Sequence, residues 1–170
     1  MVLIVTPLRL LPEVMARRSP SHLITLLSPE ELIETPVGFD PARHLRLGLH
    51  DIAEPQAGMV APEARQVEQV LAFAQGWDGA APMVVHCWAG ISRSTASAFA
   101  IACERSPHAD ELEIALAMRR ASPTAFPNRR IVALADDILD RQGRMVEAVE
   151  AMGGNGFALE GVPFELAARR

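Results

Sequence analysis

The feature that most constrains this chain is the ten-residue stretch from His86 to Thr95, which lies between two apolar runs of different character. The run before it, residues 83–85, is short and apolar, which is typical of a buried strand. The run after it, residues 96–103, consists of small and apolar residues, as in a buried helix. Gly90 lies between them, where the backbone must turn sharply or adopt a positive φ. The stretch therefore predicts a strand, a tight loop and a helix.

A loop of this kind has the parts of an anion-binding site. Between a strand and a helix N-terminus, backbone N–H groups can point into one hollow, and the helix dipole adds positive potential. In that field the thiol of Cys87 loses its proton more easily, and the thiolate is a nucleophile. The guanidinium of Arg93 matches two oxygens of a phosphate, and Ser94 can donate a hydrogen bond to the sulfur. The phosphate-binding residues predicted are Trp88, Ala89, Gly90, Ile91, Ser92 and Arg93.

The order His86-Cys87, five residues, Arg93 and then Ser94 resembles the signature of the cysteine-dependent protein tyrosine phosphatase superfamily. With Gly90 three residues after the cysteine, the string is most similar to the dual-specificity type. The resemblance covers residues 45–106 and implies a phosphatase-like α/β fold. It also implies that Cys87 forms a phosphocysteine intermediate, that Arg93 holds the phosphoryl oxygens and that His86 supports the loop from below. The implied activity is hydrolysis of phosphomonoesters, on a phosphorylated protein or a small molecule.

Two alternatives use a similar loop. The first is a catalytically inactive relative that only binds phosphate, and the presence of a nucleophile, an arginine, a hydroxyl and a candidate acid argues against it. The second is sulfur transfer or arsenate reduction, which usually needs a different loop length or additional positioned cysteines. Cys103 is the only other cysteine, and it falls in the middle of the predicted apolar helix, where we expect a packing role.

Hydrolysis through a cysteine also needs a general acid to protonate the leaving oxygen. Asp51 is the best candidate, because it begins a polar loop directly after a strand predicted over residues 45–50, and ends of elements often carry catalytic groups. The alternative interpretation is a loop carboxylate that caps nearby backbone N–H groups. Asp40 and Glu54 are weaker candidates for the acid. We interpret Asn128 as a helix N-cap and the pair Asp136-Asp137 as a solvated helix face.

The whole chain reads as one soluble phosphatase-like domain over residues 1–170, with 49% hydrophobic and 22% charged residues. A net charge of −5 argues against binding to nucleic acid or to an anionic membrane. No run is long enough to span a membrane and no signal peptide is evident, and two cysteines suit a reducing cytoplasm. All 16 basic residues besides histidine are arginine, which we interpret as the codon bias of a GC-rich bacterial genome.

Strands that alternate with helices, followed by a run of helices, predict a mostly parallel central sheet with helices on both faces. The expected strands are residues 2–5, 22–27, 45–50 and the segment that leads into Cys87. The expected helices include residues 62–75, the segment after the loop, and one that begins after Asn128. The histidines and cysteines show no paired spacing of the kind that binds zinc, so no metal and no cofactor are expected.

Overall fold

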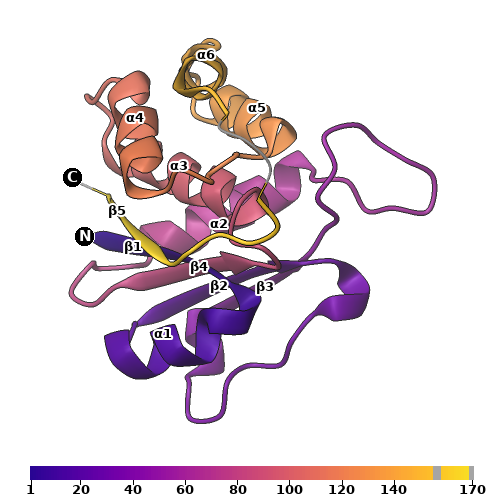
Figure 1. The fold of residues 1–170 in the computed structure, drawn as a ribbon, viewed down its shortest axis with the longest axis vertical. Coiled ribbons are helices and arrows are strands. Elements are labelled where there is room, and N and C mark those ends of the chain that lie inside the picture. The colour runs from indigo at the N-terminus through magenta and orange to yellow at the C-terminus, as the bar shows by residue number, and fades with distance from the viewer. Residues whose placement is uncertain (155–157, 169–170) are drawn as a thin grey trace.

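A five-stranded sheet forms the centre of the computed structural model, which describes residues 1–154 and 158–168 (Figure 1). The strands are β1 (Val2–Pro7), β2 (His22–Leu27), β3 (His44–Gly48), β4 (Met83–Cys87) and β5 (Phe164–Ala167), in the spatial order β3-β2-β4-β1-β5. The first four are parallel to their neighbours, and β5 runs antiparallel to β1 along one edge. The mostly parallel sheet is confirmed. The edge strand β5 was not predicted.

Helices cover both faces of this sheet, as expected (Figure 1). On one face α1 (Leu11–Arg18) buries Leu11 and Val14 against Ile4, Leu23 and Val84. The other face carries α2 (Ala64–Gln75), α3 (Arg93–Arg105), α4 (Glu111–Ala121), α5 (Arg129–Ile138) and α6 (Arg144–Met152). Short 3₁₀ turns occupy Leu8–Leu10, Pro29–Glu31 and Pro41–Arg43. Among the described residues no helix is long and apolar enough to cross a bilayer.

Strand β4 is at the centre of the sheet, and all five of its residues are buried. Such a strand is covered on both faces, which explains its continuous apolar sequence. In the register of the sheet, Cys87 lies opposite Pro7 of β1 and Leu26 of β2. The carboxyl ends of three strands therefore meet at Cys87, which is the edge where open α/β sheets bind ligands.

Helix α3 follows β4 and is buried along almost its whole length, from Arg93 to Cys103 and again at Arg105. Its neighbours are β4 and the helices α2, α4 and α5. The many alanines and serines of α3 allow these elements to approach closely. Helix α3 is thus the central helix of the layer that α2 to α6 form. Arg93 is in its first turn, beside the loop that follows β4.

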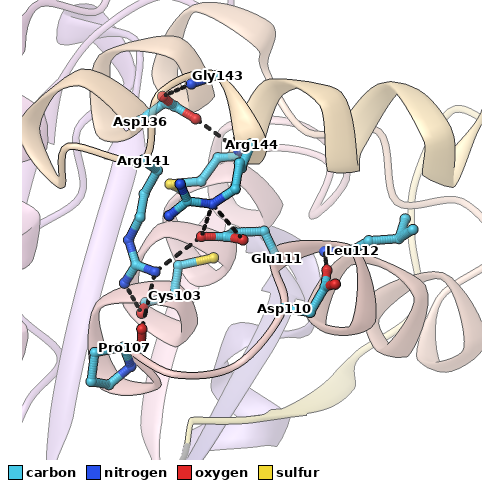
Figure 2. Close-up of polar contacts among 10 residues, drawn as sticks. Cys103, Pro107, Asp110, Glu111, Leu112, Asp136, Arg141, Gly143 and Arg144 are labelled. Atoms are coloured by element: carbon cyan, nitrogen blue, oxygen red, sulfur yellow. Dashed lines mark hydrogen bonds and ion pairs between the residues drawn. The ribbon is translucent and has the colours of Figure 1, made fainter.

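The interpretation of Asp136 as a solvated residue was wrong. Its side chain is buried, and its two oxygens accept hydrogen bonds from the backbone N–H groups of Gly143 (2.6 Å) and Met145 (2.7 Å), as Figure 2 shows for Gly143. Three residues in the turn between α5 and α6 have a positive φ: Asp140, Gln142 and Gly143. That turn folds the start of α6 back over Asp136, which then caps it.

An ionic cluster lies beside this turn, in which Glu111 and Arg141 are buried and Arg144 is half-exposed (Figure 2). The carboxylate of Glu111, in the first turn of α4, accepts hydrogen bonds from Arg141 (3.0 Å) and Arg144 (3.2 Å). Arg141 also donates to the carbonyl oxygen of Cys103 (2.9 Å), near the end of α3. The cluster joins α4 and the α5–α6 turn to the C-terminal end of α3, which is the end opposite to Arg93. The cluster therefore fixes the C-terminal end of α3, the helix that begins with Arg93.

Replacement of Glu111 by Gln should lower the free energy of unfolding by about 3 kcal/mol at pH 7, because Arg141 would be left buried without its counter-charge. Burial raises the pKa of Glu111, but its hydrogen bonds to its own backbone and to Arg144 and Arg141 outweigh burial, and the net pKa lies below 4.5. Because the pKa of Glu111 is lower in the folded protein, its carboxylate adds to the free energy of unfolding above pH 4.5. This contribution is lost as the pH falls through the pKa of Glu111 in the folded protein. Urea unfolding of both proteins from pH 7 to pH 3 should show the difference shrinking. Glu113→Gln, an exposed change on the same helix, is the control, and an equal loss there would contradict the role of the cluster.

Candidate active site

The loop between β4 and α3 has the predicted strand–loop–helix geometry, and Gly90 is essential to it. Gly90 has a φ of 69°, and a Cβ atom added there would lie 2.6 Å from the backbone nitrogen of Pro7. Both the left-handed backbone and the close approach to β1 exclude other residue types. Glycine thus lets the loop fold directly over the end of β1.

The carbonyl groups of this loop are held by the segments that surround it. The carbonyl oxygen of Trp88 accepts a hydrogen bond from Leu8 N–H (3.1 Å), and that of Ala89 from Gly161 N–H (2.8 Å). Further along, Phe126 N–H donates to Ile91 (2.9 Å) and Asn128 N–H to Ser92 (3.2 Å). Among the described residues, none accepts a hydrogen bond from the N–H groups of residues 89–92. The carbonyls are bonded outward, and the N–H groups remain available to an anion.

Cys87 and Ser94 come together at the base of this loop. The Sγ atom of Cys87 lies 3.1 Å from the hydroxyl oxygen of Ser94, which is in the first turn of α3. The cysteine is 1% exposed, so only a small group that enters the loop can reach its sulfur. The predicted pairing of the thiol with the Ser94 hydroxyl is therefore present in the geometry.

Arg93 closes the other side of the loop. Its guanidinium is buried, and Nη1 donates a hydrogen bond of 2.7 Å to the carbonyl oxygen of Leu49, just after β3. Its Nε atom is also buried and has no hydrogen-bond partner among the described residues. The contact with Leu49 fixes the plane of the guanidinium, and the remaining N–H groups can bind an oxyanion. It also links the arginine to the segment that leads into Asp51.

Asp51 lies at the mouth of the loop. One oxygen of its exposed carboxylate accepts hydrogen bonds from the Ser92 hydroxyl (2.7 Å) and from the side-chain amide of Asn128 (2.8 Å). These partners are 41 and 77 residues away, so the contacts of Asp51 are tertiary rather than local caps. Asp40, in contrast, accepts a hydrogen bond from Ala42 N–H and caps a 3₁₀ turn.

Asn128 is the functional candidate that sequence reasoning undervalued. Its side-chain oxygen caps α5 by accepting hydrogen bonds from Arg130 N–H and Ile131 N–H, which confirms the predicted N-cap. The same side chain donates to Asp51, and its backbone N–H donates to the loop carbonyl of Ser92. The sequence predicts the cap at Asn128, but it contains no local pattern that shows α5 lying beside the loop after β3.

The remaining predicted residues have different environments. His86 is fully buried beneath the loop, and burial lowers its pKa to about 4. Trp88 is 55% exposed, which places its ring at the surface rather than in the core. Cys103 is fully buried within α3, and burial raises the pKa of its thiol to about 12, which makes it unreactive. Among the described residues, no group of three or more His, Cys, Asp or Glu side chains could hold a metal ion.

Comparison with known proteins identifies the fold of this chain but finds no close relative by sequence. No protein-family model matches the chain, and no curated protein matches its sequence. Among solved structures, DUSP15 superimposes with a TM-score of 0.58 at 18% identity, covering 88% of this chain and 89% of that one. PTPMT1 gives a TM-score of 0.58 at 16% identity, covering 85% and 94%.

A third solved structure is the human tyrosine phosphatase-like serine/threonine/tyrosine-interacting protein, with a TM-score of 0.56 at 22% identity, covering 81% of this chain and 87% of that one. A second structure of PTPMT1, in complex with PI(5)P, gives a TM-score of 0.57. These matches extend over most of both chains, far beyond the signature loop. The chain therefore has the fold of the dual-specificity and tyrosine phosphatases.

Proposed function

We propose that this protein is a cysteine-dependent phosphatase that hydrolyses phosphomonoesters through a phosphocysteine intermediate. The observation that carries the proposal is the loop from Cys87 to Arg93. Four of its carbonyls accept hydrogen bonds from other segments, a thiol lies at its base beside a helix N-terminus, and a fixed guanidinium closes it. Each part suits a dianionic phosphate, and the fold shared with known phosphatases supports the same reaction.

In the first step, the loop N–H groups and Arg93 bind the phosphoryl oxygens. The thiolate of Cys87 attacks phosphorus, so that a sulfur–phosphorus bond forms as the bond to the leaving oxygen breaks. Asp51 gives its proton to that oxygen. In the second step, the Asp51 carboxylate takes a proton from water, and the water oxygen attacks phosphorus. The sulfur leaves as a thiolate, stabilised by the hydroxyl of Ser94.

The proposed substrate is a phosphorylated protein or a small phosphoester with one phosphate group. Residues 88–92 contain no lysine or arginine, so Arg93 is the only cation that the loop itself supplies. A multiply phosphorylated ligand would need further positive charge around the loop. His86 is proposed to support the loop from below, and neither a metal nor a cofactor takes part in these steps.

The alternative is a protein of the same fold that binds phosphate without turnover. One solved relative of the fold is a phosphatase-like interacting protein, so the fold alone does not separate binding from hydrolysis. Turnover of an aryl phosphate and of phosphopeptides by the purified chain separates the two functions. Binding of phosphate without any turnover would favour the alternative.

Replacement of Cys87 by Ser should abolish turnover and preserve phosphate binding, because the backbone N–H groups and Arg93 supply most of the binding site. Rapid quench with a labelled phosphopeptide should trap phosphate on the native enzyme and none on the variant. Cys103→Ala is the matched control, since Cys103 is buried in α3, and it should retain turnover. Native-like turnover by the Cys87 variant would exclude the covalent mechanism.

The role of Asp51 can be tested through the leaving group. Asp51→Asn should reduce turnover of a phosphopeptide by a factor of about 10² to 10⁴, the usual contribution of general acid catalysis. It should reduce turnover of an activated aryl phosphate much less, because a stabilised phenoxide hardly needs a proton. The basic limb of the pH–rate profile should flatten as well. Glu54→Gln and Asp40→Asn are controls, and the same leaving-group dependence in Glu54→Gln alone would reassign the acid.

The two roles of Asn128 can be separated by Asn128→Asp. Aspartate is as good an N-cap as asparagine, so the helix content measured by circular dichroism should stay at the native value. The variant cannot donate to Asp51 and places a second carboxylate beside it, which should cost about tenfold or more in phosphopeptide turnover. Serine is another good N-cap but lacks the long amide side chain. Asn128→Ser should therefore keep the stability of the native protein and lose less phosphopeptide turnover than Asn128→Asp. Full activity in the Asp variant would show that Asn128 only caps α5.

A further inference from the structure

The loop that carries Asp51 has few contacts of its own. Residues 51–59 project from one side of the molecule between β3 and α2, and all of them except Ile52 are exposed (Figure 1). Among the described residues, none outside the loop forms a hydrogen bond or an ion pair with residues 53–59, and none forms a hydrogen bond with the backbone of Asp51. The position of the Asp51 backbone therefore depends on how the two ends of the loop are held.

His50 and Val60 flank this loop and join its two ends, and we call this pair the neck. The backbone N–H of His50 donates a hydrogen bond to the carbonyl oxygen of Val60 (2.8 Å). The backbone N–H of Val60 donates to Nδ1 of the His50 ring (2.9 Å). The His50 side chain is only 14% exposed, so water competes little for that nitrogen. Two reciprocal hydrogen bonds, one of them through an imidazole, therefore close the loop at its base.

The direction of the second bond fixes where the His50 ring carries its proton. A backbone N–H can only donate, so Nδ1 of His50 is the nitrogen with the free electron pair. The proton then lies on Nε2, which is 3.3 Å from a carboxylate oxygen of Glu30, in the 3₁₀ turn after β2. A carboxylate is an acceptor, so in this tautomer both ring nitrogens have a suitable partner. Glu30 thus helps to hold the ring in the orientation that closes the neck.

His50 lies between two residues that the candidate site already uses. Leu49, directly before it, accepts the hydrogen bond from Arg93, and Asp51, directly after it, is the proposed acid. Three consecutive residues thus orient the arginine, close the neck and present the carboxylate. Because Leu49 is fixed, a change at the neck would alter the direction in which the chain continues to Asp51. A small displacement of a catalytic group is enough to reduce turnover strongly.

We propose that His50 is a positioning residue for the general acid: by accepting the Val60 N–H at Nδ1, its ring closes the neck and fixes the backbone that carries Asp51. This role rests on the proposed function, from which it takes Asp51 as the acid. Without the ring acceptor, the neck keeps one hydrogen bond in place of two. The loop can then pivot at its base, and Asp51 spends less time in the geometry that proton transfer to the leaving oxygen requires.

Two amide substitutions at position 50 separate this role from a merely structural one. Asparagine places its side-chain oxygen where Nδ1 lies, so His50→Asn keeps an acceptor for the Val60 N–H. Glutamine is one methylene longer and has no acceptor there, although its amide can still donate to Glu30. His50→Gln should reduce phosphopeptide turnover about tenfold and turnover of an activated aryl phosphate less than about twofold, whereas His50→Asn should retain most turnover of both. Equal losses on both substrates, or in both variants, would overturn the inference.

Amide hydrogen exchange and NMR test the neck without a substrate. Val60 is an exposed residue, so its N–H should exchange slowly only while it bonds to the ring. Exchange at Val60 should be slow in the native protein and in His50→Asn, and about tenfold faster in His50→Gln. The N–H of Met59, which bonds to Gln56 inside the loop (3.1 Å), is the internal control and should change much less. Nitrogen NMR should show native His50 as the Nε2–H tautomer, and a proton on Nδ1 would contradict the proposal.

The outcomes for the neck and for the proposed function can be told apart. No turnover of any phosphoester by the native protein would reject the proposed function, and the catalytic role of His50 with it, whatever the exchange rates. Native turnover together with native-like rates in His50→Gln on both substrates would reject the positioning role alone. If His50→Gln does not fold, Val60→Pro removes the same hydrogen bond from the donor side and leaves the ring intact. It should show the same leaving-group dependence, and its absence there would overturn the inference.

Discussion

The candidate site depends on how the carbonyl groups of one loop are satisfied. A tight loop exposes both donors and acceptors, and it can bind an anion only if its acceptors point elsewhere. Here four carbonyls, those of Trp88, Ala89, Ile91 and Ser92, bond to four N–H groups from other parts of the chain. Those donors belong to the segment after β1, the segment before β5 and the segment before α5. The edge strand β5 thus has a role beyond the sheet, because it anchors the segment that contains Gly161.

The same loop is fixed from the side of the helix. Arg93 is at the first turn of α3, and its direction is set by the Leu49 carbonyl, while the other end of α3 is held by Arg141 of the ionic cluster. Because α3 is held at both ends, the guanidinium of Arg93 keeps a fixed position relative to the thiol of Cys87. Pre-organised groups of this kind need little rearrangement when charge develops in a transition state, which is why electrostatic stabilisation is effective in enzymes.

The site is assembled from segments that are far apart in the sequence. Asp51 follows β3, Ser92 precedes α3 and Asn128 precedes α5, and their side chains meet in two hydrogen bonds. The neck of the loop after β3 is assembled in the same way, from His50, Val60 and the segment after β2. In both cases each residue on its own looks like a cap or a packed polar group. Only their joint geometry shows that they lie within hydrogen-bond distance of one another.

The sequence by itself determined the strand–loop–helix unit, the mostly parallel sheet with helices on both faces, and the cap at Asn128. These depend on local patterns: hydrophobic periodicity, a glycine at a turn and polar residues at helix ends. The signature from His86 to Ser94 also identified Cys87 and Arg93 as candidates, and the position of Asp51 after a predicted strand identified the candidate acid. The catalytic roles of all three stay predictions. Only the tertiary structure decided that Asp136 is buried, that β5 forms an edge strand, that Asn128 contacts Asp51 and that Val60 bonds to the ring of His50. Those facts depend on which elements pack side by side, and a local pattern carries no information about distant neighbours.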